Sequence, residues 1–168
     1  RRLLIANRGE IAVRIIRACK ELGIETVVVY STADKESLAV QLADQAVCIG
    51  PEPAKDSYLN MGLIVQTACS TGCDAVHPGY GFLSENAKFA RLVQECDMTF
   101  VGPNPKLIQM MGDKTQARKL MKEAGVPVVE GCEDALKSVE DAKNMAELIG
   151  YPVIIKARLG GGGRGMRI

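Results

Sequence analysis

The chain has 168 residues, 47% of them apolar and 24% charged, a composition typical of soluble globular proteins. Its 21 lysines and arginines and 20 aspartates and glutamates leave a net charge of +1. Surfaces that bind nucleic acid normally carry a strong excess of basic residues. Aromatic residues make up only 4% of the chain, with no tryptophan to stack on bases. The composition therefore argues against a nucleic-acid partner.

No apolar stretch approaches the roughly 20 residues of a membrane-spanning helix, and the apolar residues 3–6 are too few for a signal peptide. Six cysteines are scattered along the chain at positions 19, 48, 69, 73, 96 and 132. Cys69, Cys73 and the single His77 form the only close group, and a structural zinc ion takes four ligands. We therefore expect no membrane segment, no metal site, reduced thiols and a cytoplasmic location.

Short apolar strands alternate with amphipathic helices over roughly the first 100 residues. Strands are expected at 3–6, 26–30, 46–49, 74–77 and 99–101. Helices are expected over 10–22, from a cap at Asp56-Ser57 to Ala68, and from a cap at Ser84 through Leu92. Such an alternation predicts a parallel sheet with both faces covered. The predicted fold class is α/β, a Rossmann-like doubly wound domain.

The pattern changes after residue 103, where helices replace the strand–helix alternation. Asp113 is placed to cap one of these helices, and Ser138-Val-Glu-Asp141 forms a capping box for another. We expect residues 1–112 to form one whole domain and residues 113–168 to be the truncated start of a second.

A glycine-rich segment near the end of the chain is the strongest functional signal. A strand expected over 152–157 carries Lys156, five of the residues 160–165 are glycine, and a returning strand begins at 166. Backbone amides without a neighbouring Cβ can lie directly on phosphate oxygens, and a lysine adds a positive charge. The alternative is a flexible linker, although linkers usually mix in serine and lack flanking strands.

Two familiar phosphate-binding motifs are absent. No Gly-x-x-x-x-Gly-Lys-Ser/Thr sequence occurs, and the segment after the first strand, Ala6–Ala12, has one glycine where a dinucleotide fingerprint has three. We therefore expect the Rossmann-like domain not to hold a dinucleotide in the usual way.

The second signal is the segment His77-Pro-Gly-Tyr-Gly-Phe-Leu-Ser-Glu-Asn86. It follows the carboxyl end of an expected strand, where ligands bind in open α/β sheets. Its glycines and proline favour an unusual backbone path that presents Tyr80, Phe82 and Glu85. A tight turn with core aromatics before a capped helix explains the same residues, and a lone His77 at a strand end is more often structural than a general base.

A third pattern places Arg14, Arg17 and Glu21 at helical spacing with Glu10, opposite the apolar face of the first helix. A solvated helix face explains this pattern. A polar interface between subunits explains it as well.

Four segments together resemble the biotin carboxylases of the ATP-grasp superfamily, in matching order and spacing along the whole chain. They are Ile5–Ala12, His77–Asn86, Met111–Lys114 and Tyr151–Ala157 with Gly160–Met166. The resemblance implies an enzyme that uses Mg-ATP and bicarbonate to carboxylate biotin on a biotin carboxyl carrier protein, by way of carboxyphosphate. A carboxyltransferase is the implied second partner, and acetyl-CoA carboxylase, with a role in fatty acid biosynthesis, is the expected assembly.

The resemblance also implies roles for particular residues. ATP would be contacted by Lys114, Lys156, Gly162, Gly163 and Met166. The biotin and bicarbonate side would be bordered by Tyr80, Phe82 and Glu85. A homodimer interface would contain Arg14, Arg17 and Glu21. The Mg²⁺ ligands, the bicarbonate-binding basic residues and the catalytic arginine would all lie beyond residue 168, so we expect no catalytic residue or metal ligand in this chain and no turnover by it alone.

The sequence leaves two other functions open. One is another ATP-grasp ligase that activates a different carboxylate, which ATP turnover without biotin would identify. The other is a non-catalytic Rossmann-like scaffold whose glycine run is a hinge, which would tolerate Lys156→Ala. Arg158-Leu159 departs from the small residues often found before the four glycines, which bears on subtype. The final acceptor (acetyl-CoA, propionyl-CoA, methylcrotonyl-CoA or pyruvate) is not specified by this chain.

Overall fold

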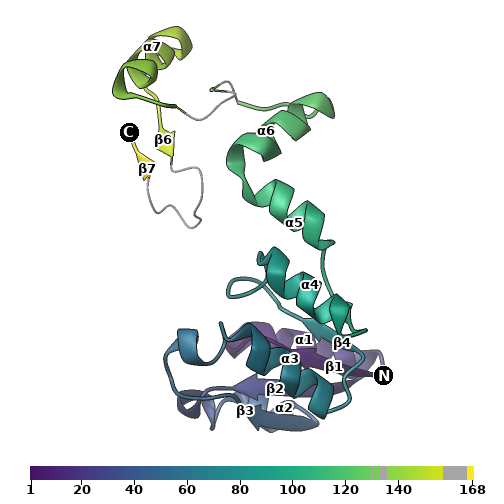
Figure 1. The fold of residues 1–168 in the computed structure, drawn as a ribbon. Helices are drawn as coiled ribbons and strands as arrows, with labels where there is room; N and C mark the ends of the chain where they lie inside the picture. Colours follow the sequence, from purple (N-terminus) through teal and green to yellow (C-terminus); the bar gives the residue numbers. More distant parts are fainter. Residues whose placement is uncertain (130, 133–135, 157–165) are drawn as a thin grey trace. The chain divides into compact units, whose positions relative to one another are not determined.

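The computed structural model describes residues 1–129, 131–132, 136–156 and 166–168. The chain divides into two compact units, Arg1–Ile108 and Gln109–Ile168, and each is described by itself (Figure 1). No helix within the described ranges is both long and apolar enough to cross a membrane.

The first unit is built on a five-stranded sheet in which every pair of neighbours is parallel. The strands, in spatial order, are β3 (Gln45–Cys48), β2 (Glu25–Tyr30), β1 (Arg2–Ile5), β4 (Ala75–His77) and β5 (Thr99–Phe100). The chain leaves β1 toward β2 and β3, then returns to the other side of β1 for β4 and β5. The predicted doubly wound sheet is confirmed, with its topological switch point between β1 and β4.

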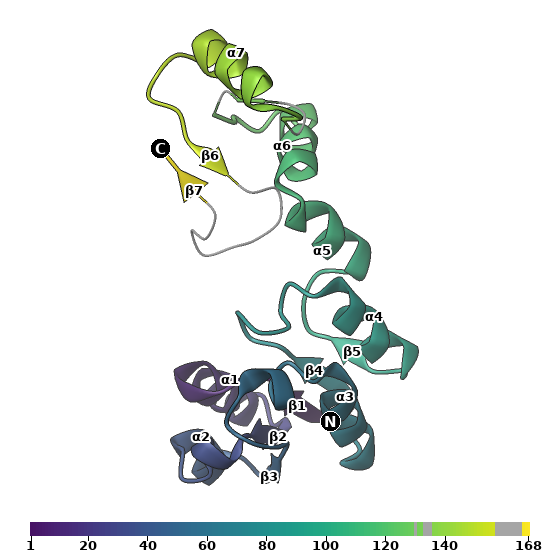
Figure 2. The ribbon, with the colours of Figure 1, turned by 60° about the vertical axis from the view of Figure 1, so that its left-hand side comes forward.

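Helices cover both faces of this sheet (Figure 2). One face carries α1 (Gly9–Glu21) and α2 (Leu38–Leu42), and the other carries α3 (Met61–Ser70) and α4 (Ala87–Glu95). Alternate residues of β1 supply the two cores, because successive side chains of a strand point to opposite faces. Leu3 and Ile5 belong to the core under α1, whereas Leu4 belongs to the core under α3 and α4.

The helix α3 begins later than the sequence predicts. Its cap is Asn60, whose Oδ1 accepts a hydrogen bond from the Leu63 amide at 3.1 Å, and the predicted cap at Asp56-Ser57 is wrong. Residues Ala54–Asp56 instead form a short 3₁₀ helix, η2, and the Ser57 hydroxyl donates to the Pro53 carbonyl at 3.0 Å. The polar side chain expected to start the helix is thus already used in the preceding turn.

The helix α4 also begins later than expected. Asn86 caps it by accepting from the Phe89 amide at 3.0 Å, and the predicted cap at Ser84 is wrong. The Ser84 amide donates to the Gly81 carbonyl at 2.9 Å, so Ser84 belongs to the turn before the helix. The helix α2 and the 3₁₀ helix η1 (Thr32–Asp34) were not predicted, because both are too short to show a clear periodicity.

In the second unit, α6 (Lys114–Glu123) starts as predicted. The Asp113 carboxylate accepts from the amides of Thr115 at 3.0 Å and Gln116 at 3.3 Å. The division between the units falls within α5 (Pro105–Gly112).

The helix α7 (Val139–Ile149) is capped by Ser138, which accepts from the Asp141 amide at 3.0 Å. The other half of the predicted capping box differs, because the Asp141 carboxylate accepts from the Lys137 amide at 3.3 Å. An antiparallel pair, β6 (Ile155–Lys156) and β7 (Met166–Arg167), closes the described part of this unit. Within that part, β6 is shorter than the strand expected over 152–157.

Candidate active site

The turn between β4 and α4 lies at the switch point of the sheet, at the carboxyl ends of β1 and β4. His77 ends β4 and pairs with Ile5 of β1. The side-chain amide of buried Asn7, two residues after β1, donates to the carbonyls of Pro78 at 2.7 Å and Tyr80 at 2.8 Å. Asn7 thus fastens the end of β1 to the first half of the turn.

The backbone of the turn passes repeatedly through the left-handed region. Gly79 and Gly81 have φ values of +64° and +70°, and Phe82 follows at 42°. A Cβ at Gly79 would lie 2.6 Å from Cγ2 of Ile11 and 2.7 Å from Nδ2 of Asn7. Only glycine combines this φ with this close approach, so the path of the turn depends on it.

The turn presents the three side chains predicted there from the sequence, those of Tyr80, Phe82 and Glu85. Tyr80 is 65% exposed, and its hydroxyl donates to Oε1 of Glu10 at 3.2 Å, which raises the pKa of Tyr80. Phe82 is 37% exposed and Glu85 is exposed. Leu83 between them is buried in the core and anchors the turn. Two aromatic rings and one carboxylate therefore belong to a single anchored turn at the carboxyl edge.

His77 is held within this turn. Its Nδ1 accepts a hydrogen bond from the Gly79 amide at 3.0 Å, which assigns the ring proton of the neutral form to Nε2. Burial lowers the pKa of His77 below its ordinary value. The contact gives His77 a structural role in shaping the turn.

A second cluster joins a residue of this turn, Phe82, to residues from three other segments. The Tyr58 hydroxyl donates to Oδ2 of Asp34 at 2.6 Å and accepts from the Ser31 amide at 2.9 Å. Oδ1 of Asp34 forms an ion pair with Nη2 of Arg8 at 2.5 Å. The Phe82 ring stacks on Tyr58, with 5.2 Å between ring centroids and 21° between ring planes. The cluster connects the ends of β1 and β2 to the turn after β4.

Burial and hydrogen bonding set the protonation of this cluster. Burial and the hydrogen bond to Asp34 raise the pKa of Tyr58 to about 12, so its hydroxyl stays a donor. Burial by itself raises the pKa of Asp34, but hydrogen bonds from Tyr58 and Ser31 and the charge of Arg8 outweigh it, and the net pKa is lowered. Asp34 therefore stays a carboxylate near neutral pH.

Sequence reasoning did not identify Asn7, Arg8, Asp34 or Tyr58 as site residues. A signal existed for the first two, which are polar residues directly after an apolar strand at the edge where ligands bind. Asp34 and Tyr58 carried no such signal, because loops far apart in the sequence bring them to the turn.

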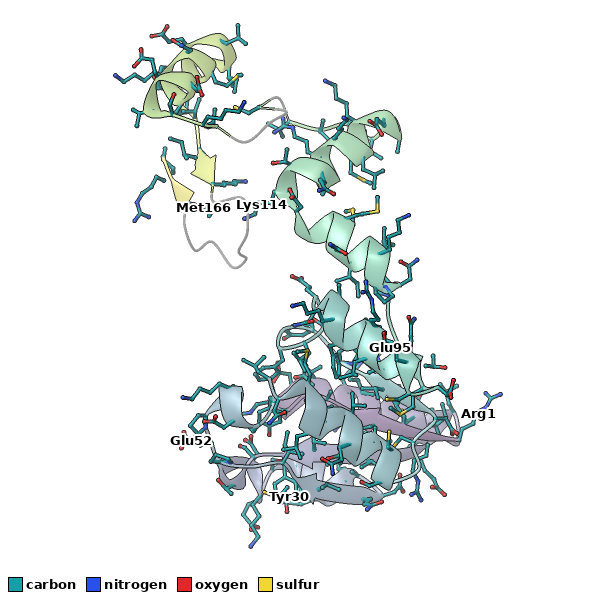
Figure 3. All side chains as sticks on the ribbon, viewed as in Figure 1. Arg1, Tyr30, Glu52, Glu95, Lys114 and Met166 are labelled. Carbon is teal, nitrogen blue, oxygen red and sulfur yellow. The ribbon has the colours of Figure 1, made fainter. Side chains whose placement is uncertain are left out.

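The second unit carries the residues expected to contact ATP. Lys156 of β6 and Met166 of β7 are paired across the antiparallel strands, and both are exposed. Lys114 is the first residue of α6 and is also exposed (Figure 3). Lysine side chains are well suited to phosphate oxygens. Gly162 and Gly163 lie outside the described residues.

Arg14 and Arg17 lie on the exposed face of α1. Together with Leu38 and Ala39 of α2 they line a cavity of about 690 Å³ between the two helices. Glu21, at the end of α1, is exposed and does not line this cavity. Among the residues that the structure describes, no group of three or more His, Cys, Asp or Glu side chains is placed to hold a metal ion.

Comparison with protein-family models divides the chain in two. The model for the biotin carboxylase N-terminal domain matches residues 1–108, and the model for the ATP-binding domain of the carbamoyl-phosphate synthase L chain matches residues 113–168. Biotin carboxylase 1 of Bacillus subtilis (strain 168) is 62% identical over 168 residues, which are 100% of this chain and 37% of that protein.

Solved structures agree with these matches. The biotin carboxylase complex with β,γ-ATP from Campylobacter jejuni superposes with a TM-score of 0.95 at 48% identity, over 99% of this chain and 37% of that one. The biotin carboxylase domain dimer of 2-oxoglutarate carboxylase from Hydrogenobacter thermophilus, solved with MgADP, ADP and bicarbonate, has a TM-score of 0.94 at 54% identity. That match covers 99% of this chain and 36% of its counterpart. Because the biotin carboxylase N-terminal model matches residues 1–108 and the identity to biotin carboxylases extends along the whole chain, this chain belongs to the biotin carboxylase family.

Proposed function

We propose that the chain is the N-terminal part of a biotin carboxylase, a ligase that uses Mg-ATP and bicarbonate to carboxylate biotin. The observation that carries this proposal is the succession of matches, a biotin carboxylase N-terminal domain followed at once by an ATP-binding domain. The chain spans about 37% of the length of the curated relative it matches, so the proposal concerns the whole enzyme. We divide the domains at residue 112, because α6 begins after the Asp113 cap.

The second unit is proposed to bind ATP through Lys114, Lys156 and Met166, with Gly162 and Gly163 over the phosphates. Two exposed ammonium groups suit the charge of a triphosphate, and Lys156 and Met166 share one strand pair. The Mg²⁺ ligands are assigned to the part of the enzyme beyond residue 168. Mg²⁺, when bound, would neutralise charge on the phosphates.

The first unit is proposed to border the biotin and bicarbonate side with Tyr80, Phe82 and Glu85. In the proposed reaction a bicarbonate oxygen attacks the γ-phosphorus of ATP, ADP leaves, and carboxyphosphate forms. Carboxyphosphate then splits into CO₂ and phosphate, and the released phosphate takes the proton of the biotin ureido N–H. A new N–C bond forms between that nitrogen and CO₂. The exposure of the three side chains on an anchored turn supports this role. The basic residues for bicarbonate and the catalytic arginine are assigned beyond residue 168, so we expect residues 1–168 alone to be inactive.

The proposed partners are a second copy of the enzyme, a biotin carboxyl carrier protein and a carboxyltransferase. The dimer contact is assigned to the face of α1 that carries Arg14, Arg17 and Glu21, all exposed here. We assign the enzyme to acetyl-CoA carboxylase, and thus to fatty acid biosynthesis. A relative 54% identical to this chain is named 2-oxoglutarate carboxylase small subunit. Assays with each carboxyl acceptor are therefore needed to identify the carboxylase to which this enzyme belongs. A cytoplasmic location fits the six cysteines, none of which forms a disulfide.

Phosphate release tests the proposed reaction directly. The full-length enzyme that contains residues 1–168 is assayed with Mg-ATP, bicarbonate and free biotin, omitting each in turn, with the 168-residue chain alongside. We expect release that requires both bicarbonate and biotin, and none from the short chain. Release that ignores biotin would leave only an ATP-grasp ligase of another substrate. Release by the short chain would disprove its inactivity.

A further inference from the structure

The conformation of Phe82 needs support from outside the turn. Its φ of 42° lies in the left-handed region, which is unfavourable for a residue with a Cβ. Phe82 follows two glycines that adopt positive φ freely, but it gains no such freedom itself. A non-glycine residue stays in this region only when surrounding contacts hold it there.

The ring of Phe82 is held by a stack on Tyr58. The ring centroids are 5.2 Å apart and the planes differ by 21°, the offset-stacked range for aromatic pairs. Tyr58 is fully buried, whereas Phe82 is 37% exposed. One ring therefore belongs to the rigid core and the other borders solvent at the carboxyl edge of the sheet.

Tyr58 is itself fixed on its polar end. Its hydroxyl donates to Asp34 at 2.6 Å and accepts from the Ser31 amide at 2.9 Å. The Ser31 hydroxyl also donates to Asp34, at 3.0 Å, and Arg8 pairs with the same carboxylate. The guanidinium carbon of Arg8 lies 5.6 Å from the centroid of the Tyr58 ring. The ring can neither rotate out nor slide without breaking several of these contacts.

Other contacts hold the backbone on either side of Phe82. The Ser84 amide donates to the Gly81 carbonyl at 2.9 Å and so closes a turn across Phe82, but this bond does not fix the Phe82 ring. The side-chain amide of Asn7 donates to the carbonyls of Pro78 and Tyr80, two residues that precede Phe82. Leu83, the residue after Phe82, is buried and anchors the turn on that side. The stack on Tyr58 is the ring contact that Phe82 itself makes.

We propose that Tyr58 is a positioning residue for the carboxylation of biotin. Its fixed ring holds Phe82, and with it the turn of residues 77–86, in the conformation that receives biotin. This inference rests on the proposed function, which places Phe82 beside biotin. Tyr58 is fully buried behind the Phe82 ring, so its role would be indirect. The proposed role in the reaction thus belongs to a buried residue outside the turn.

Two substitutions of Tyr58 and one matched control test the proposal in the full-length enzyme. Tyr58→Leu removes the stack, and Tyr58→Phe keeps the ring but removes the hydroxyl. Phe100→Leu removes another aromatic ring from the same core, one whose ring contact is with Phe89. We expect Tyr58→Leu to raise the KM for biotin about tenfold with the KM for ATP unchanged, since about 1.4 kcal/mol of lost positioning is a factor of ten. Tyr58→Phe keeps the stack but loses the hydrogen bonds to Asp34 and Ser31, so it should raise the KM for biotin less than Tyr58→Leu does. Phe100→Leu should lower Tm without changing either KM.

Unchanged KM values in Tyr58→Leu would overturn the proposal, and so would an equal rise of the KM for biotin in Phe100→Leu. Crystal structures of the wild-type and Tyr58→Leu enzymes give a readout that does not depend on activity. We expect φ of Phe82 to leave the left-handed region in Tyr58→Leu, and an unmoved Phe82 would overturn the proposal. If the wild-type enzyme needs no biotin, the proposed function fails, and the position of Phe82 still decides whether Tyr58 holds the turn.

Discussion

Asn7 and Gly79 lie against each other at the switch point, with Nδ2 of Asn7 2.7 Å from the place that a Cβ of residue 79 would occupy. The same nitrogen donates to the carbonyls on either side of Gly79, those of Pro78 and Tyr80. The absence of a side chain at one position thus makes room for the side chain that holds its neighbours. This pairing joins β1 to the turn that we assign to the biotin side.

Replacing Gly79 with alanine should be strongly destabilising. The new Cβ would meet Asn7, which two hydrogen bonds hold in place, and the φ of +64° disfavours any side chain. We expect Gly79→Ala to lower the free energy of unfolding by about 3 kcal/mol. Gly81→Ala is the matched control, because φ is +70° there but a Cβ would meet open space. Gly81→Ala should lower the free energy of unfolding by about 1 kcal/mol, and urea titrations of both variants measure the two losses. Equal losses in both variants would contradict the steric argument.

Two substitutions of Asn7 should distinguish the effect of losing its hydrogen bonds from the effect of changing the size of its side chain. Asn7→Ala leaves two carbonyls without their donor and should cost about 2 kcal/mol of unfolding free energy. Asn7→Asp keeps the shape but turns an acceptor toward both carbonyls, so it should cost more than alanine does near neutral pH. Urea unfolding of both variants measures the difference. A tolerated aspartate would show that the two hydrogen bonds contribute little.

The stability of the turn should depend on pH through His77. Burial lowers the pKa of His77 in the folded protein below the ordinary value of 6.5, and its Nδ1 must stay unprotonated to accept from the Gly79 amide. The unfolded chain therefore binds the proton more readily. The contribution to stability is complete above about pH 6.5 and declines as the pH falls from there toward the folded-state pKa.

Unfolding free energies of wild type and His77→Gln between about pH 7.5 and pH 5 check this dependence. His77 is the only histidine in the chain, so we expect the histidine-dependent slope to disappear in the variant. Identical pH profiles for the two proteins would rule out the assignment.

The contribution of the Asp113 cap of α6 to stability should be separable from the contribution of the Asp113 charge. Asp113→Ala removes the acceptor for the amides of Thr115 and Gln116 and should cost about 1 kcal/mol. Asp113→Ser should recover most of this loss, because serine caps helices about as well as aspartate. Thermal unfolding followed by circular dichroism compares the three proteins. A serine variant as unstable as the alanine variant would point to the other interactions of Asp113 instead.

Lys156→Ala should weaken the binding of ATP in the full-length enzyme. Losing a charged hydrogen-bond donor to phosphate typically costs about 1.5 to 3 kcal/mol, which corresponds to a KM for ATP raised about tenfold or more. Lys143→Ala is the control, since Lys143 is an exposed lysine of α7 that forms a 3.8 Å ion pair with exposed Glu140. Steady-state kinetics with varied ATP compare the two variants. An unchanged KM in Lys156→Ala would count against the assignment of this lysine.

Local chemistry explains which features the sequence alone predicts. The alternation of apolar strands and amphipathic helices determined the doubly wound parallel sheet, because each strand must bury both of its faces. Asp113 and Ser138 were predictable caps, since each bonds an amide two or three residues ahead. The residues of the 77–86 turn were predictable as candidates for a similar reason, because strand ends and glycines are visible in the sequence.

Tertiary structure decided the features that depend on distant segments. Asn60 and Asn86 became caps in place of Asp56-Ser57 and Ser84 because the preceding turns already used those residues. Tyr58 reaches Asp34 across 24 positions of sequence, and it reaches Phe82 only because the sheet brings their segments to one edge. Such contacts form when the chain closes over its core, and no periodicity or spacing along the sequence encodes them. The sequence by itself thus determined the fold and the candidate turn, whereas the packing of separate loops decided what holds that turn in place.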